Sequence, residues 1–384
     1  MATTGSPFEA PPTERYLGLQ AAEIRVEPFA AHHLPLVAAF SERYWSRPRT
    51  EAFYRWRYLD SQPFSRMFLA LTDAECLGMV FGLRKPYLIG GERTSCLEVF
   101  DWHCLPGLKG SGVGIRVMRA MMRVGERVIS IGGTEDVLKT LPALGWQRIG
   151  GARMYELPLS ADFLESGLRR RLPVRVPGER ILLHAAAVTW FRPRRRTRRP
   201  LGRIVSVPVI DLEAQPLYQG ETGYDVLQLP DAQLQRWTSS GCAGTGHFGF
   251  FHFASEGRLR GWAMTRVHDT PQGREAAILD VFAPEPDVAL YTWMVSEAAF
   301  SLARARPHVI RARASCPILQ AALCANRFRP DEAETPVYTW PKTLRNDLRL
   351  HITLNHSDGP LRPYPLPGDA TGLLAKPVDS APAL

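Results

Sequence analysis

The sequence predicts an α+β fold with two similar domains, each built on a mixed, mostly antiparallel sheet that is flanked by helices. Three observations support this prediction. Short alternating segments at 24–26, 67–71 and 77–83 are typical of early antiparallel strands. A strand, a glycine-rich turn and an amphipathic helix then follow within 97–127. The same order of patterns recurs, more weakly, in the second half of the chain.

Length and composition are those of an ordinary globular protein. The chain has 384 residues, of which 45% are hydrophobic and 22% charged, so two domains can each bury a full core. The six cysteines form no CxxC pair and have no metal-ligand spacing, which favours reduced thiols and no bound metal. The first dozen residues lack the basic and apolar parts of a signal peptide. We therefore expect a cytoplasmic protein.

The net charge of +9 is concentrated in one linker. An arginine run begins at Arg192 and ends at Arg199, just after an apolar stretch at 181–191 that is too short to span a bilayer. A solvated linker is the default interpretation. Peripheral contact of these arginines with an anionic membrane is the alternative. Nucleic acid is the less favoured partner, because few aromatic residues are interleaved with the arginines.

The glycine-rich turn is the strongest functional signal in the chain. A strand at 97–105 ends at Pro106, and the helix after the turn places apolar residues at three- and four-residue intervals. Glycine permits positive φ and close approach of a ligand to backbone amides. The first turn of a helix adds unpaired N–H groups and a positive dipole end, which suit a phosphate. The expected anion site comprises Lys109, Gly110, Ser111, Gly112, Val113 and Gly114, and Leu105 at the end of the strand is expected to bind the same ligand.

Comparison with known phosphate loops narrows this prediction. A Walker loop would end in Gly-Lys-Ser/Thr, and a dinucleotide fingerprint would need glycine where Ile115 stands. The segment Lys109-x-x-Gly112-x-Gly114 instead resembles the acetyl-CoA motif Arg/Gln-x-x-Gly-x-Gly/Ala of the GNAT (Gcn5-related N-acetyltransferase) superfamily, with Lys in place of Arg or Gln. The resemblance implies acetyl-CoA as an acyl donor that is held by the loop residues named above.

Further segments carry the same resemblance across residues 22–159. Trp56-x-Tyr58 with an intervening Arg57 resembles a W-[KR]-Y segment of one GNAT subgroup, and Gly145-Trp146 stands where Leu-Gly-Phe is usual. The second half, 203–350, repeats the order of elements. There, residues 284–287 (Pro-Glu-Pro-Asp) replace the glycines and add two negative charges, so this copy is expected to be degenerate and unable to bind CoA.

The expected organisation is therefore a tandem one. A flexible tail at 1–21 precedes the N-acyltransferase domain at 22–159, which is followed by the Arg/Pro-rich linker at 160–202. The degenerate GNAT-like domain at 203–350 and a Pro/Gly-rich tail at 351–384 complete the chain.

Acyl transfer to an amine needs a base, donors for an oxyanion and a departing thiolate. The resemblance implies that the thioester lies along the strand before the loop, where a backbone N–H acts as donor. In an unbroken strand Asp101 and His103 share a face and Glu98 takes the other. An Asp that orients a His is a credible base, whereas a bulge would bring Glu98 or Trp102 into play. A packed, non-catalytic histidine is the alternative for His103.

Three functions fit this pattern. The first is an acetyl-CoA-dependent N-acyltransferase that acts on a small-molecule amine, such as an amino sugar. The second is a non-catalytic CoA-binding or scaffold protein with a GNAT fold. It is supported by Leu141, which stands where the family often has a Tyr that protonates the leaving thiolate. The third is a FemAB-like aminoacyl transferase, which the intact CoA loop disfavours.

Overall fold

The protein is described by a computed structural model that covers most of the chain. It describes residues 24–45, 49–165, 181–183, 185, 201–211, 222–241, 246–270, 273–345, 347–356 and 361. The expected N-terminal tail, the arginine run from Arg192 to Arg199 and nearly all of the expected C-terminal tail lie outside these residues.

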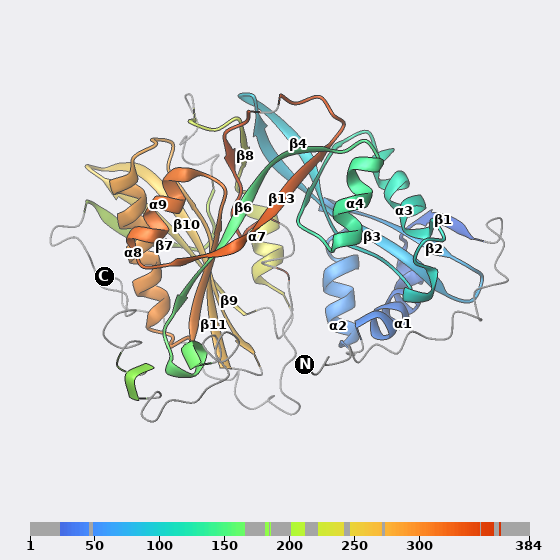
Figure 1. Cartoon of the computed structure of the whole chain (residues 1–384), viewed down its shortest axis with the longest axis horizontal. Helices are drawn as coiled ribbons and strands as arrows, with labels where there is room; N and C mark the ends of the chain where they lie inside the picture. Colours follow the sequence, from blue (N-terminus) through green and yellow to red (C-terminus); the bar gives the residue numbers. More distant parts are fainter. Residues whose placement is uncertain are drawn as a thin grey trace. The chain divides into compact units, whose positions relative to one another are not determined.

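The chain forms two compact units, which Figure 1 shows coloured along the sequence. Unit 1 comprises Met1–Gly151, Tyr224–Trp237 and Thr335–Leu350. Unit 2 comprises Ala152–Gly223, Thr238–Glu334 and His351–Leu384. Neither unit is continuous in sequence. The expected domains at 22–159 and 203–350 were defined by a repeated order of sequence patterns, which is a different criterion from compactness. That division stays a prediction.

Unit 1 has a mixed sheet in the spatial order β1-β2-β3-β4-β5, with the end of β13 beside β5. The first four strands form the predicted antiparallel meander, and β5 pairs parallel to β4. Gly90 and Gly91 take φ of 60° and 87° at the tight β3–β4 turn, a conformation that favours glycine. The strands are β1 (Arg25–Pro28), β2 (Ser65–Leu71), β3 (Cys76–Ile89), β4 (Glu92–Cys104), β5 (Arg127–Ile131), β8 (Val226–Gln228) and β13 (Arg329–Trp340).

Helices flank this sheet, as the sequence predicted. The helix between β4 and β5 buries the apolar face read from its spacing, including Val117 and Met121. Gly82 of β3 makes room for that helix, because a Cβ there would meet Met121 Cε at 3.3 Å. The helices are η3 (Ala31–His33), α1 (Leu34–Trp45), α2 (Glu51–Tyr54), the π-helix η4 (Arg55–Leu59), η5 (Gln62–Phe64), η6 (Pro106–Leu108), α3 (Val113–Met122), α4 (Glu135–Ala143) and α7 (Ala232–Ser239).

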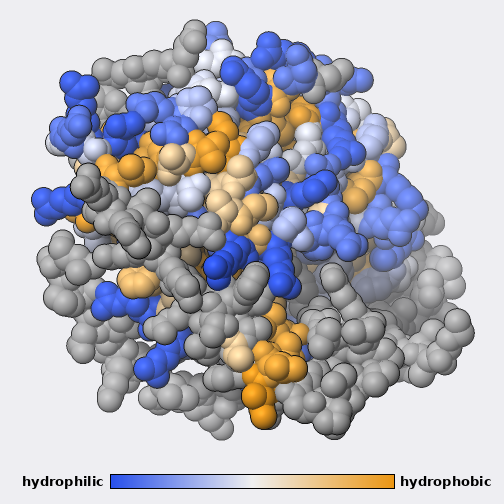
Figure 2. Space-filling model, turned by 60° about the vertical axis from the view of Figure 1, so that its left-hand side comes forward, coloured by the Kyte–Doolittle hydropathy of each residue, from blue (hydrophilic) through white to orange (hydrophobic). Residues whose placement is uncertain are grey.

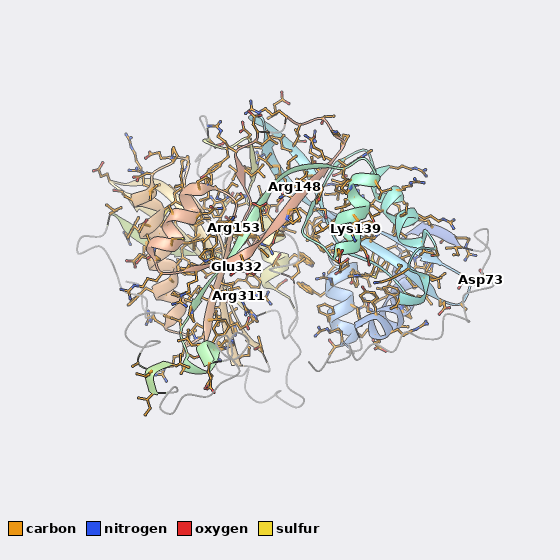
Figure 3. The ribbon with its side chains drawn as sticks, viewed as in Figure 1. Asp73, Lys139, Arg148, Arg153, Arg311 and Glu332 are labelled. Atoms are coloured by element: carbon orange, nitrogen blue, oxygen red, sulfur yellow. The ribbon has the colours of Figure 1, made fainter. Side chains whose placement is uncertain are left out.

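Unit 2 has the strand order β6-β12-β11-β10-β9-β7, in which β10 and β11 are antiparallel and β11 and β12 parallel. Helix α8 connects β11 to β12 and packs beside α9, as Figure 1 shows. Arg311, labelled in Figure 3, joins three strands, because it donates to Glu156 at 3.0 Å and also to Glu275. The elements are β6 (Gln147–Pro158), β7 (Arg203–Val207), β9 (His247–Ser255), β10 (Arg258–Thr270), β11 (Gly273–Phe282), α8 (Val288–Ala303), β12 (Val309–Ala314), α9 (Pro317–Ala325) and β14 (Leu350–His351).

Two local predictions differ from the structure. The sequence patterns at 146–149 and 154–157 predict two separate strands, yet β6 runs through both of them. Gly150, within β6, leaves room for Leu350, because a Cβ there would meet Leu350 Cδ1 at 2.6 Å. Residues 351–356, expected as the start of the loose tail, are buried in unit 2, where Thr353 bridges to Ala314.

The surface carries few large apolar side chains among the described residues. Figure 2 shows one face, on which apolar groups are interspersed with hydrophilic ones. Ile181 and Leu182 are the most exposed large apolar residues, at 76% and 68%. Within the described ranges, no helix is both long and apolar enough to cross a bilayer, and no three metal-ligating side chains gather.

Candidate active site

Strand β4 carries a bulge just before the glycine loop. Phe81 pairs with Phe100 and Met79 with His103, so one extra residue of β4 lies opposite β3. Asp101 takes φ of 51° there, a left-handed conformation that costs most residues about 1–2 kcal/mol and Asp less. Because paired residues share a face, the bulge places His103 on the same face as Phe100. Two residues earlier, Glu98 shares that face, so the parity change considered from the sequence is present.

Asp101 is held by two consecutive residues of η4. Its Oδ2 accepts hydrogen bonds from Arg57 Nε at 2.9 Å and Arg57 Nη2 at 2.7 Å, and from the Tyr58 hydroxyl at 3.0 Å. The Arg57 and Asp101 side chains are only 5% and 9% exposed. Burial, reinforced by the Asp101 charge, raises the pKa of Tyr58 well above its usual value, so this phenol remains a donor. The structure thus pairs Asp101 with Arg57 and Tyr58 rather than with His103.

Glu98 is enclosed in a second buried cluster. Its side chain is 1% exposed and lies 2.7 Å from Lys85 Nζ, and the Tyr87 hydroxyl donates to its Oε1. Lys85 is itself 3% exposed. Removing one partner of such a pair leaves an uncompensated buried charge, which is strongly destabilising. Glu98 therefore has a structural partner that the sequence pattern did not indicate.

His103 lies beyond the bulge, against helix α1. Its ring centroid is 4.4 Å from that of Tyr44. Burial raises the pKa of Tyr44, the nearby Cys104 adds to this effect, and Lys109 opposes it. The Tyr44 hydroxyl therefore stays protonated close to the loop. Nothing in the sequence pattern pointed to Tyr44, because its relation to His103 exists only after α1 packs on the sheet.

The glycine loop leaves the start of α3 open. Gly110 and Gly112 both take φ of 84°, and a Cβ built on either would meet nothing within 4 Å. Gly112 precedes the first helical residue and provides no side-chain cap, while the Val113 N–H lies 3.4 Å from Ser111 Oγ. Ser111 Oγ donates to Leu108 O at 2.7 Å, which fixes the turn. Open glycine amides at a helix N-terminus fit a pyrophosphate.

A contact at Gly114 fixes the beginning of α3 to β4. The Trp102 indole N–H donates to Gly114 O at 2.8 Å. Next to it, burial raises the pKa of the Cys104 thiol, and Lys109 and the Gly114 backbone oppose this effect. Lys109 lies at the loop surface, 3.2 Å from Asp136, which raises the pKa of its ammonium group. The loop therefore carries a positive charge at its rim. Leu105, also expected in the site, is buried and donates its N–H to Leu77 O at 3.0 Å.

Strands β4 and β5 stop pairing before the bulge. Their register extends from Cys96↔Arg127 to Val99↔Ser130, and on its other side β5 pairs with the end of β13 over residues 128–131. The part of β4 from Phe100 to Cys104 has no strand partner on this side among the described strands. Backbone N–H groups that point to this side of β4 therefore do not take part in a β4–β5 ladder beyond Val99.

Comparisons with known proteins support the fold. No family model and no curated protein sequence matches the chain. Among solved structures, yeast (Saccharomyces cerevisiae) N-myristoyltransferase with bound myristoyl-CoA aligns at a TM-score of 0.59 and 9% identity, covering 86% of this chain and 81% of that one. A probable N-acyltransferase from Enterococcus faecalis aligns at 0.54 and 10%, covering 82% and 72%. A GCN5-related N-acetyltransferase from Anabaena variabilis aligns at 0.53 and 10%, with the same coverage.

At these identities the likeness concerns the fold alone. The chain has a GNAT-like fold, with a mixed sheet flanked by helices, and the alignments cover most of its length. The resemblance read from the glycine loop is confirmed at that level.

Proposed function

We propose that the protein is an N-acyltransferase that moves an acetyl group from acetyl-CoA to a small-molecule amine at the glycine loop of unit 1. The observation that carries this proposal is the pair of open, left-handed glycines, Gly110 and Gly112, at the uncapped start of α3. The part of β4 beside that loop, which has no partner strand on the β5 side among the described strands, supports it. The three similar structures given above are named as acyltransferases or probable acyltransferases, which is consistent with this proposal.

The chain's own residues supply the phosphate contacts, the oxyanion donors and the base, while the C–S bond breaks as the amide bond forms and CoA leaves as the thiolate. The bound thioester supplies the activated acyl group. The loop from Lys109 to Gly114 holds the pyrophosphate, chiefly through the N–H groups of Gly110 and Gly112, because those of Lys109 and Ser111 bond to carbonyls of the turn. Backbone N–H groups of β4 beyond Val99 donate to the developing oxyanion. His103 is the base that takes the proton from the amine, since neutral imidazole is suited to this near pH 7. Asp101 and Glu98 each have a buried cationic partner, so we assign them supporting roles.

The acceptor is proposed by class only. A primary amine on a small molecule, such as an amino sugar, fits a base that is carried by the sheet. We keep peripheral contact with an anionic membrane, through the arginine run from Arg192 to Arg199, as a proposal that awaits liposome binding. The cytoplasm is the proposed location.

A CoA-binding protein without catalysis is the second candidate. It is favoured by Leu141, which is fully buried where a leaving-group acid would stand. Turnover separates the two candidates. Release of free CoA thiol from acetyl-CoA in the presence of a panel of amines indicates an enzyme, whereas tight binding without any release indicates a binding protein.

Binding of acetyl-CoA to wild type and to Gly112→Glu tests the shared part of both candidates. Glu at Gly112 adds a carboxylate beside the phosphate position and a Cβ at φ of 84°, so calorimetry should show affinity lower by about 100-fold or more. Gly91→Glu is the matched control, because Gly91 has φ of 87°, equally open space and a place at the far end of β4. Wild type without affinity for acetyl-CoA, or Gly112→Glu with unchanged affinity, would refute the site.

A further inference from the structure

The β4 bulge is held through one side-chain oxygen, that of Asp101. All three side-chain donors described for Asp101 converge on one oxygen, Oδ2, and two of them come from the same guanidinium. Arg57 is 4% exposed, so this contact is shielded from water. Hydrogen bonds to charged groups are shorter and stronger than neutral ones, and in a dry site they fix geometry as well. The left-handed residue of the bulge is therefore clamped through its side chain.

The donors are arranged by the unusual helix that carries them. Arg57 and Tyr58 are adjacent in η4, where the Asp60 N–H bonds to Arg55 O in a π-type turn. Adjacent residues of an ordinary helix do not face the same partner. Here both side chains reach one carboxylate oxygen, and π-turns are found frequently at functional sites.

Two further contacts keep η4 in place. Ser61 Oγ donates to the Arg57 carbonyl at 2.6 Å. Trp56 and Trp237 stack at 5.0 Å and exchange reciprocal bonds, each indole N–H donating to the other's carbonyl at 3.1 Å. Both indoles are buried. The helix that carries Arg57 and Tyr58 is therefore held in place by buried contacts of its own.

The Arg57 guanidinium also packs on the aromatic residues that border the bulge. The Arg57 Cζ atom lies 5.6 Å from the centroid of the Phe100 ring and 5.8 Å from that of the Phe81 ring. Phe100 immediately precedes Asp101 in the strand. Cation–π attraction and the ion pair therefore act on neighbouring residues of one short segment. That segment determines where the backbone N–H groups of β4 point and on which face of the strand His103 lies.

We propose that Arg57 and Tyr58 are positioning residues, which hold the β4 bulge through Asp101 and so aim the oxyanion donors and His103 at the reacting atoms. This inference rests on the proposed acyl transfer. It assigns a role to the Arg and Tyr of the W-R-Y segment that neither the sequence pattern nor the comparisons provide.

The test uses the full-length chain with Arg57→Gln, Arg57→Lys, Tyr58→Phe and Asp101→Asn. Arg55→Gln is the matched control, because Arg55 lies in the same π-helix with a side chain that is 58% exposed. We expect Arg57→Gln and Asp101→Asn to lower kcat about 100-fold, the usual effect of misplaced reacting groups. The affinity for acetyl-CoA should stay within about 2-fold, since the loop is untouched. Arg57→Lys and Tyr58→Phe, which keep part of the donor set, should fall between these values and wild type.

Hydrogen exchange of the β4 amides gives a readout that does not depend on activity. Exchange in residues 99–104 should accelerate in Arg57→Gln and remain at the wild-type rate in Arg55→Gln. Unchanged kcat together with unchanged exchange would overturn the inference, and so would a parallel loss of acetyl-CoA affinity and global stability. If Arg57→Gln fails to fold, Tyr58→Phe decides, because it removes one hydroxyl; wild-type kcat and exchange in that variant overturn the inference. Wild type that binds no acetyl-CoA refutes the proposed function instead, while the exchange measurement still tests the clamp.

Discussion

The two units make the same strand-to-helix junction in opposite ways. In unit 1, β4 leads through glycines into α3, whose start has no side-chain cap. In unit 2, β11 also has a register shift, at Leu279, and leads into α8. There the Asp287 side chain caps the helix by accepting the Ala289 N–H at 2.7 Å. The residue before α3 is a glycine without a side chain, whereas the residue before α8 accepts a helix amide with its own side chain.

A second difference lies beside the bulged strand. In unit 2, residues 351–355 lie along the edge of β11 beyond its pairing with β12. The Asn355 N–H donates to Leu279 O at 2.8 Å, and His351 Nε2 lies 3.0 Å from Val281 O. The other side of the segment bonds Ser315, next to β12. The equivalent edge of β4 has no such segment among the described residues. In unit 2 the chain's own backbone thus occupies the strand edge that in unit 1 has no such segment among the described residues.

The largest expected effect comes from truncating a side chain in the segment that lies along the edge of β11 in unit 2. Ile352 is fully buried, so Ile352→Ala should lower the free energy of unfolding of unit 2 by about 2–5 kcal/mol through lost packing and a residual cavity. Denaturant unfolding, with hydrogen exchange to locate the loss, measures this. Ile181→Ala, at a position 76% exposed, is the control and should stay within about 0.5 kcal/mol of wild type. Equal stability of both variants would mean that the segment only rests on the sheet.

Acid should release the same segment. Burial lowers the pKa of His351 from 6.5 to about 4, and His351 Nδ1 lies 3.9 Å from Asp280 Oδ1. Above pH 6.5 the histidine is neutral in both states. Between 6.5 and about 4 only the unfolded state takes the proton, so stability falls by about 1.4 kcal/mol per pH unit and then levels off. His351→Gln, which keeps a donor for Val281 O, should flatten this part of the pH profile. An unchanged slope would assign the acid sensitivity to other groups, such as His268, whose pKa burial lowers to about 3.

The smallest expected effect concerns the cap of α8. Asp287→Ala removes the bond to the Ala289 N–H and should cost about 1 kcal/mol of unit 2 stability. It should leave acetyl-CoA affinity unchanged, because the open junction belongs to unit 1. Thermal unfolding and calorimetry on one sample check both statements. A gain of a second acetyl-CoA site in Asp287→Ala would break the comparison, since it would mean that the cap alone closes unit 2.

Local patterns in the sequence predicted the parts of the site that depend on neighbours in the chain. The strand before Pro106, the open glycines and the buried face of α3 follow from spacing within 97–127, and the structure has all of them. The apolar pattern that begins at Pro317 predicts a helix to Ala325, and α9 has these bounds. These features rest on periodicity and glycine conformation, which a few residues determine.

The rest depends on pairings between distant residues. Arg57 reaches Asp101 from 44 positions away, and nothing near either residue specifies that contact. Lys85 pairs with Glu98 only because the long β3–β4 hairpin sets their register. The bulge was considered from the sequence, but its place is decided by that same register. Residues 351–356 have loop-like composition, and their burial follows from an edge that only the folded unit 2 provides.

The composition of unit 1 also bears on how the nascent chain folds. Its last strand partner, Val337–Trp340 on β5, and its Trp237 anchor for η4 are made long after the glycine loop. Domains commonly fold as they leave the ribosome, N-terminal part first. Here the edge of β5 stays unpaired until residues 337–340 have been synthesised. Until then, the first half of the chain exposes the unpaired backbone groups of that strand. Such edges invite aggregation, and production of residues 22–159 alone should require a chaperone or should fail.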